Sequence, residues 1–590
     1  MTRYLNTRSN RPCLVAPLAR VIRKRRHWIS ASHLRNFFMK DYVVDWLKSL
    51  KKSKFNNNQT SPVQSFLMSK GIEFENTVIS YIHNNIMPVV TVSDTITDSS
   101  VATVKNLMFQ GVPCIHSAPV RNDNNNTRGI IDILIRSDYI NKLVKSEVLS
   151  QKEMLTSAPR LNGNYHYLVI DVKFSTLNLR SDGVHLLNSD YLPFYKAQCL
   201  IYTQAIAEIQ GISANKAFIL GRRYTYTQKS QKYNGMHMLD KLGVINFDTV
   251  DNEYISRTKQ AIEWRKTLFT HGKTWTASPP SNEYLYPNMC IDSHDFQTEK
   301  QKLAEDIGEI TLLWYCGVKE RNNALMNGIS SWRDPRCSST TLGVTGIRAK
   351  NIDAIISINR DINDRIIIPD KLQSNISALN NITEIFIDFE TITDVFTPMN
   401  GVTDIIFMIG VYCNSVYTNF TCIQPTLEEE KRIITEFYNF LQGFGDSIRV
   451  YFWCAEKRFW RHSITRHFSL ESLIVKCCES WVDLNALFIQ ESIAIKGCFN
   501  YTLKGIASAL FKNGVIKTRL ESECDNGMSA SLKAMQVYNN NSINNSINNS
   551  INNSINNSIN NPLLMDISNY NKFDCVVLQE ILSYLRECYA

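Results

Sequence analysis

Acidic side chains stand inside several apolar segments of the sequence, and one of these segments also carries a lysine. Gly129 to Arg136 (GIIDILIR) and Tyr165 to Lys173 (YHYLVIDVK) have the length and composition of strands and include Asp132 and Asp171. Asp171 and Lys173 are two residues apart, and side chains at that spacing on a strand project from the same face. We therefore expect one carboxylate and one ammonium group to meet at one place in the fold.

A carboxylate and an ammonium group at one place suit the hydrolysis of phosphodiester bonds. Carboxylates hold Mg²⁺ or Mn²⁺, which activates water and steadies the leaving oxygen, and a lysine offsets the developing charge. The alternative is structural: Asp171 and Lys173 form an ion pair at a strand end, and Asp132 caps a turn. An Asp-x-Lys motif taken alone favours that alternative, so the surrounding residues decide.

Residues at further characteristic spacings surround this motif. Gly71 and Glu75 lie four residues apart on a predicted helix, and Gln198 and Tyr202 share one face of a later predicted helix. The order of these motifs resembles the RecB-like branch of the PD-(D/E)XK nuclease superfamily over roughly Trp28 to Arg223. The resemblance implies that Lys173 assists the attacking water and that Gln198 and Tyr202 support the site and the DNA. It also implies three metal ligands: Glu75, Asp132 and Asp171.

Two departures from that family pattern affect the expected cofactor. Glu75 stands where many relatives carry His, which keeps a ligand but shifts the preference towards oxygen-loving ions such as Mg²⁺ or Mn²⁺. Some relatives hold an iron–sulfur cluster on four flanking cysteines, but Cys13, Cys199 and Cys290 are not grouped in that way. We expect no iron–sulfur cluster.

The second acidic segment is Glu384 to Thr391 (EIFIDFET), where Asp388 and Glu390 share one face of a predicted apolar strand. Two adjacent acids on a buried strand repel each other unless a cation lies between them. The alternative is a strand that ends in solvent. Because the next run, Ile405 to Val411 (IIFMIGV), predicts another core strand, we favour a divalent metal.

Asp-x-Glu-Thr before an apolar hairpin resembles the ribonuclease H-like fold of DnaQ-type 3′–5′ exonucleases, which use four acids for two metals. Tyr570 and Asp574 match the Tyr-x-x-x-Asp motif of that family, in which the Asp binds metal and the Tyr orients the water. Glu456, at the end of the predicted strand Arg449 to Glu456, replaces the usual Asp, and we assign it as a ligand. Asp483 is kept as a supporting residue, although it could equally be a helix N-cap.

The order of DFET, the strand ending at Glu456, VDL, YTLKGIA at Tyr501 to Ala507 and YNKFD resembles the YprB-type ribonuclease H-like domain. In some proteins this domain follows a RecB-like nuclease. We therefore predict an α/β protein with an N-terminal restriction-endonuclease-like mixed sheet with helices, a helical connector and a C-terminal ribonuclease H-like α/β domain. The predicted boundaries are 1–27 for a basic tail, 28–275 for the first nuclease domain, 276–380 for the connector and 381–590 for the second domain.

Three segments outside the motifs have distinct compositions. The first forty residues contain no Asp or Glu, which fits a solvated basic tail, a nuclear-import or phosphate-binding patch, or an organellar transit peptide; we favour the tail. Residues 538–561 repeat Asn, Asn, Ser and Ile and predict a disordered surface insertion. The turn from Gly343 to Gly346 could place amides against a phosphate, but we favour a rigid helical spacer for the connector.

Bulk composition agrees with a multidomain protein that acts on nucleic acid. A chain of 590 residues is longer than one hydrophobic core usually organises. The net charge of +9 is compatible with a phosphate-bearing partner. No apolar run of about 18 residues predicts a membrane span. The 15 Cys include no C-x-x-C pair, which favours reduced thiols. We therefore expect an intracellular protein of the nucleus or cytoplasm, which would be those of a host cell if the source is a virus.

The leading hypothesis is a metal-dependent nuclease that acts on DNA in repair, recombination or processing. Two alternatives stay open: a non-catalytic scaffold that binds nucleic acid, and an RNA-processing 3′–5′ exonuclease that uses mainly the C-terminal domain. No phosphate-binding loop of the Gly-x-x-x-x-Gly-Lys-Ser/Thr type is present, so any helicase partner would be a separate chain.

Overall fold

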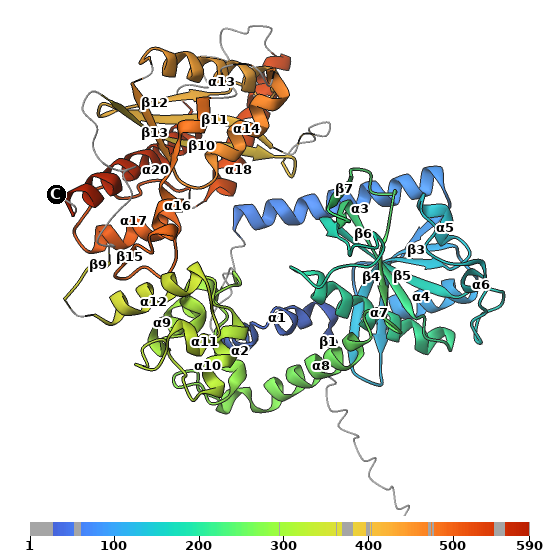
Figure 1. The fold of residues 1–590 in the computed structure, drawn as a ribbon. Helices are drawn as coiled ribbons and strands as arrows, with labels where there is room; N and C mark the ends of the chain where they lie inside the picture. The colour runs from blue at the N-terminus through green and yellow to red at the C-terminus, as the bar shows by residue number, and fades with distance from the viewer. Residues whose placement is uncertain are drawn as a thin grey trace, which may run out of the picture.

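The fold is that of a computed structural model, which places two mixed sheets in separate parts of an α/β chain joined by a helical segment (Figure 1). It describes residues 27–51, 61–293, 296–361, 363–367, 382–396, 402, 404–445, 447–469, 472, 474, 477–524, 526–547 and 561–588. The predicted basic tail therefore lies outside the described residues, apart from His27. The predicted α/β class is confirmed.

The N-terminal unit is built on an eight-stranded sheet in the order β2-β3-β4-β5-β6-β7, with β1 beside β4 and β8 beside β6. β3 and β4 form an antiparallel hairpin, β4 and β5 are antiparallel, and β5 and β6 are parallel. The strands are β1 (Ile29–Ser30), β2 (Val89–Thr91), β3 (Cys114–Asn122), β4 (Thr127–Arg136), β5 (Tyr167–Asn178), β6 (Lys216–Gln228), β7 (Gln231–Gly235) and β8 (Gly243–Asn246).

Both faces of this sheet are covered, which explains why β5 is apolar almost throughout its first half. One core cluster joins the sheet to α4 and α7, and a second joins the opposite face to α3 and α5. The helices are α1 (Arg35–Phe38), α2 (Tyr42–Lys51), α3 (Pro62–Asn85), α4 (Asp98–Phe109), α5 (Ile140–Leu143), α6 (Gln151–Met154), α7 (Leu192–Gln210) and α8 (Glu253–His271).

The C-terminal unit has a five-stranded sheet in the order β12-β11-β10-β13-β14. β10 pairs antiparallel with β11 and parallel with β13, and β13 pairs parallel with β14. Its strands are β10 (Thr383–Thr393), β11 (Asp404–Cys413), β12 (Val416–Thr421), β13 (Ile448–Phe452) and β14 (Val482–Asp483), and its helices are α13 (Leu427–Gln442), α14 (Glu456–His467), α16 (Leu484–Gln490), α17 (Leu503–Lys512), α18 (Gly527–Ile547) and α20 (Pro562–Glu587).

The connecting segment packs into the C-terminal unit and is not an independent spacer. Buried residues such as Trp332 and Ile352 share one core cluster with Phe488 and Leu582, and β9 (Ile366–Ile367) pairs with β15 (Ala494–Ile495). The Gly343–Gly346 turn leads into a helix whose Arg348 pairs with Glu320 at 3.5 Å. The helices of this segment are α9 (Gln297–Ile307), α10 (Val318–Met326), α11 (Ser339–Leu342) and α12 (Ile347–Arg360).

Specific contacts also join the N-terminal unit to the rest of the chain. On α9, Lys300 forms a fully buried ion pair at 2.8 Å with Asp41. On β6, Arg222 and Arg223 pair with Asp394, which follows β10. These contacts place the end of β10 against the sheet that carries Asp171.

One predicted boundary differs from the structure. The insertion 538–561 was expected to be disordered from its start, but α18 continues to Ile547, and Tyr538 is buried with its hydroxyl donating to the carbonyl oxygen of Cys422 at 3.0 Å. The aromatic ring at the start of the repeat therefore extends a packed helix. Residues 548–560 of the repeat lie outside the described residues. None of the described helices is long and apolar enough to cross a membrane.

Candidate functional site

The first carboxylate cluster forms where β4 and β5 lie side by side. The register that pairs Ile133 with Ile170 continues to bring Asp132 next to Asp171. The Nζ of Lys173 lies 2.6 Å from Oδ2 of Asp171 and 3.9 Å from Oδ2 of Asp132. Strand alternation thus produces the predicted meeting of two carboxylates and one ammonium group.

Burial shifts the pKa values of the carboxyl groups in this cluster. Asp171 has no exposed surface, and neither of its carboxylate oxygens accepts a geometrically satisfactory hydrogen bond within the described structure, although the Lys173 ammonium is close. Burial and then the charge of Asp171 raise the pKa of Asp132 to about 8. Burial also raises the pKa of Asp171, against the opposing charge of Lys173. The cluster has more negative charge than one lysine neutralises.

Glu75 on α3 approaches the same cluster and has a partner that the sequence did not reveal. Its charge raises the pKa of Asp132 and of Asp171. Its Oε1 lies 3.0 Å from Nε2 of His116 on β3, and Nδ1 of His116 lies 3.1 Å from the hydroxyl of Thr91. An imidazole therefore lies beside Glu75, and it comes from a strand. This contact depends on the packing of α3 on the sheet that contains β3, which the sequence did not show.

Gln198 and Tyr202 contact each other on α7, as their spacing predicted. Nε2 of Gln198 donates to the Tyr202 hydroxyl at 2.9 Å, and Tyr202 is buried. The ring of Tyr202 occupies the space above Gly129 on β4, where an added Cβ would lie 2.3 Å from Cε1. The glycine three residues before Asp132 is therefore needed for the aromatic side chain that packs beside the acids.

Replacing Gly129 with Ala is expected to displace Tyr202. We expect the free energy of unfolding to fall by about 1–3 kcal/mol, because overpacking moves the ring or the strand. Gly71→Ala is the matched control: it lies within α3, nothing lies within 4 Å of its added Cβ, and it should stabilise the protein by about 0.5–1 kcal/mol. Denaturant unfolding of both variants checks this, and equal stabilities would contradict the packing explanation.

The second carboxylate cluster gathers four acids from three parts of the C-terminal unit. Asp388 and Glu390 lie on β10, Glu456 begins α14 after β13, and Asp574 lies on α20. Glu390, Glu456 and Asp574 are 3%, 5% and 6% exposed, so only a small opening leads to them. The structure thus brings together all four acids that the sequence assigned to this site.

The acids of this cluster oppose one another's ionisation. Burial raises the pKa of Asp388 to about 6. Burial, and then the charge of Asp388, raises the pKa of Glu390, of Glu456 and of Asp574 well above their usual values. Tyr570 lies against the same group, since burial and the charge of Asp574 raise its pKa. Four ionised carboxylates cannot share this space without a compensating cation.

Two residues at this site were not predicted. Nδ2 of Asn571 donates to Oδ2 of Asp388 at 2.7 Å, and Gly410 makes room for it, because a Cβ there would lie 1.5 Å from Oδ1 of Asn571. Burial raises the pKa of Asp388 and of Asp574, and the charge of Lys504 on α17 opposes that rise; its Nζ lies 4.2 Å from the centre of the Tyr570 ring. Lys504 belongs to the YTLKGIA motif, which could have indicated it.

Asp483 has the structural role that was left open for it. It is the N-cap of α16, and its Oδ1 accepts hydrogen bonds from the backbone N–H groups of Ala486 and Cys454, both at 3.1 Å. Its charge also raises the pKa of Glu456. Asp483 therefore fixes the loop that presents Glu456 and lies at the edge of the cluster.

The donor atoms of both clusters fit a hard divalent cation. Among the described residues, no group of three or more His, Cys, Asp or Glu side chains is arranged as a ready-made metal site. Buried carboxylate oxygens without a hydrogen-bond partner nevertheless occur in both clusters: Oδ1 of Asp171, Oε2 of Glu456 and Oδ1 of Asp574. Mg²⁺ and Mn²⁺ bind oxygen ligands of this kind, and an unpartnered buried acceptor is otherwise costly.

Metal binding should change how stability depends on pH. A carboxyl whose folded pKa is raised holds its proton longer in the folded state, so stability falls as pH rises from about 4 through the folded pKa. With pKa values of about 8 for Asp132 and about 6 for Asp388, we expect the melting temperature in EDTA to fall between pH 5 and 8. Mg²⁺ should remove most of that fall, which thermal unfolding at each pH measures. A Mg²⁺ effect of equal size at pH 5 and pH 8 would contradict the prediction.

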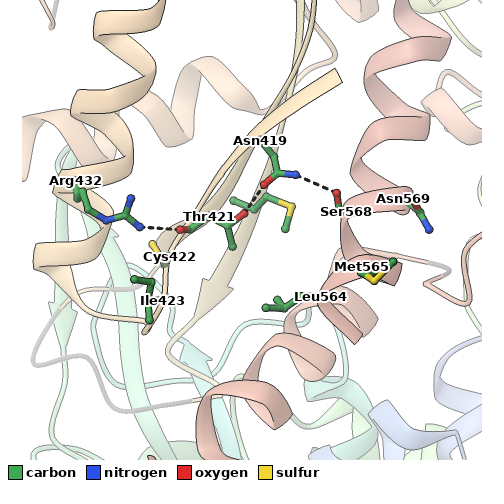
Figure 2. A pocket seen from close by; sticks show the side chains of 10 residues that line it. Asn419, Thr421, Cys422, Ile423, Arg432, Leu564, Met565, Ser568 and Asn569 are labelled. Atoms are coloured by element: carbon green, nitrogen blue, oxygen red, sulfur yellow. Dashed lines mark hydrogen bonds between the residues drawn. The ribbon is translucent and has the colours of Figure 1, made fainter. Parts of the chain in front are cut away.

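A separate hollow of about 460 Å³ lies between β12, α13 and the start of α20 (Figure 2). Its wall is held by hydrogen bonds: Nδ2 of Asn419 donates to the Ser568 hydroxyl at 3.0 Å, and Arg432 donates to the carbonyl oxygen of Thr421 at 2.8 Å. These polar groups are used within the wall, and the carboxylates lie further along α20. The two acidic clusters are therefore the better candidates for a catalytic site.

None of the protein-family models matches the chain, and no curated protein matches its sequence. The two side-chain clusters are therefore the features from which a function can be inferred.

Proposed function

We propose that the protein is a metal-dependent nuclease with two centres that hydrolyse phosphodiester bonds, the first acting on DNA. The observation that carries this proposal is the buried Asp171 carboxylate, which lies 2.6 Å from Lys173 and beside Asp132 and Glu75. A purely structural ion pair would not need two further acids around a single lysine. The order of the second sheet, three antiparallel strands followed by two parallel ones, supports a ribonuclease H-like domain, and the first mixed sheet supports a RecB-like one.

At the first centre, Glu75, Asp132 and Asp171 would hold the ion. When bound, Mg²⁺ or Mn²⁺ would activate a water molecule and stabilise negative charge on the phosphate. Although burial alone would lower it, the pKa of Lys173 is raised above its usual value by the charges of Asp171 and Asp132. Lys173 therefore stays a cation at neutral pH, so it stabilises the developing charge and orients the water and does not accept its proton.

At the second centre, Asp388, Glu390, Glu456 and Asp574 would hold metal ions. Tyr570 keeps its hydroxyl proton because its pKa is raised, so it can donate a hydrogen bond and orient an attacking water. Lys504 lies against the same ring and brings a positive charge towards the phosphate position. This division of roles is the one expected of a DnaQ-type exonuclease.

A non-catalytic scaffold that binds nucleic acid is the second candidate. It is favoured by one observation: the described residues include no ready-made group of three metal ligands. The same observation also fits the proposed nuclease, because acids that repel one another turn apart when no cation lies between them.

Cleavage assays distinguish these candidates. The purified chain is incubated with end-labelled single-stranded and duplex DNA and RNA in Mg²⁺, Mn²⁺ or EDTA, beside an Asp171→Asn/Asp388→Asn double variant. We expect metal-dependent cleavage that the double variant loses. Cleavage in EDTA, or cleavage that the double variant retains, contradicts the proposal, whereas tight binding without cleavage supports the scaffold.

A further inference from the structure

A basic hollow of about 480 Å³ opens at the carboxyl ends of β13 and β14, next to the second carboxylate cluster. Parallel strands direct ligand-binding loops towards this edge of a sheet. The hollow is not one of the two acidic clusters, and none of its basic side chains has a role in the proposed chemistry. The side chains that give it its character are Lys457, Arg458, Arg461, His462, Trp481 and Asp483.

The basic side chains of the hollow come from one face of α14. Lys457 and Arg461 are one helical turn apart, as are Arg458 and His462, so the four project side by side. The opposite face of the helix is buried through Trp460. Amphipathic packing therefore fixes α14 with its cations directed away from the core, and like charges one turn apart cost stability unless an anion joins them.

The charge balance of the hollow favours an anion. Asp483 is the one carboxylate that lines the hollow beside Lys457, Arg458 and Arg461, and its Oδ1 is already used by two backbone N–H groups. Two of the basic side chains have partners outside the lining: Lys457 donates to the carbonyl oxygen of Glu479 at 3.2 Å, and His462 lies 3.8 Å from Asp404. Within the described part of the chain, no carboxylate forms an ion pair with either arginine, and both are exposed. An arginine presents a planar fork of donors that suits a phosphate.

The hollow lies beside the second cluster, because Asp483 and Cys454, which both line it, are joined by a hydrogen bond in the loop that leads to Glu456. Lys457 directly follows Glu456, and Asp483, which lines the hollow, raises the pKa of Glu456. A strand with one phosphodiester at the four acids would therefore carry a neighbouring phosphate past α14. The ligand is a phosphate and not a base, because Trp481 is only 5% exposed and presents no stacking face.

We infer that this hollow binds a backbone phosphate of the single strand that is cut at the second centre, and so positions the strand. The inference rests on the proposed function, since it places the substrate of that centre. Arg458 and Arg461 are positioning residues, because they hold the strand and do not touch the reacting phosphate.

Fluorescence anisotropy of the full chain with labelled 20-nucleotide single-stranded DNA and RNA, in EDTA, tests the inference. Arg458→Gln/Arg461→Gln should weaken binding about tenfold at 0.1 M salt and lower the slope of log K against log salt by about one. Lys431→Gln/Lys512→Gln is the control: it removes the same charge from exposed positions on α13 and α17. A preference for DNA or RNA identifies the strand that the hollow accepts.

Cleavage by the second centre alone separates this inference from the proposed function. In an Asp171→Asn background, the double arginine variant should raise KM about tenfold and leave kcat unchanged. Affinity and salt slope equal to those of the lysine control would overturn the phosphate site, even where cleavage persists. Weakened binding in a protein that never cleaves would support the site and contradict the proposed activity.

Discussion

Asp171→Asn is expected to lower DNA cleavage by the first centre about 10³-fold or more. The substitution keeps the shape of the side chain but removes the charge that holds the cation, and that ion supplies several kcal/mol of transition-state stabilisation. It also leaves the Lys173 ammonium without the carboxylate that lies 2.6 Å from its Nζ. We expect kcat to fall more than KM rises, since the phosphate backbone is bound elsewhere.

The measurement compares initial rates on the preferred DNA substrate with Asp171→Asn and with Asp98→Asn. Asp98 is a suitable control because it lies in the same unit and its side chain is 96% exposed. Melting curves of both variants show whether the fold persists. A folded Asp171→Asn protein that cleaves within a factor of three of wild type, in a background where Asp388 is also replaced, would exclude a catalytic first centre.

Local periodicity was enough to predict which neighbouring residues share a face at each centre, whereas Glu75, Asp132 and Glu456 were assigned from the resemblance to nuclease families. Alternation along a strand places Asp171 with Lys173 and Asp388 with Glu390, and one helical turn relates Tyr570 to Asp574. These relations depend only on residues that are close together in the sequence, so they can be predicted without knowledge of the fold. The same holds for Gln198 and Tyr202, whose predicted contact is a hydrogen bond in the structure.

Residues that reach a site through tertiary pairing were not predictable. His116 meets Glu75 across 41 residues because α3 packs on the sheet that contains β3, and Asn571 meets Asp388 across 183 residues because α20 packs on β10. The connector was expected to be a spacer for a related reason. Its helical pattern shows that Trp332 and Ile352 are buried, but it cannot show that they share a core with the C-terminal unit.

Asp574→Asn is expected to act in opposite directions on stability and on activity. Oδ1 of Asp574 is buried without a hydrogen-bond partner, and the charge of Asp388 opposes its ionisation. A neutral amide removes one charge from the crowded site and can donate to a neighbouring carboxylate, so we expect about 1–2 kcal/mol of stabilisation in EDTA at pH 8. Cleavage by the second centre should fall about 10²–10³-fold, because a ligand of the ion is lost.

Asp566→Asn on the same helix provides a control of opposite sign. Asp566 pairs with Lys533 at 2.6 Å, and that lysine outweighs partial burial and lowers the pKa of Asp566, so its charge is favourable. Losing this charge should destabilise the protein and leave cleavage nearly unchanged. Thermal unfolding in EDTA and rates in the Asp171→Asn background measure both effects.

The contrast between Asp574 and Asp566 distinguishes a binding site from a structural network. Carboxylates that maintain a fold are stabilising when ionised, whereas carboxylates retained for a cation are destabilising until that cation arrives. If Asp574→Asn lowered the melting temperature in EDTA as Asp566→Asn does, the four acids would be part of an internal hydrogen-bond network. A rise in EDTA, together with loss of the Mg²⁺-induced stabilisation, is the result that only a cation site explains.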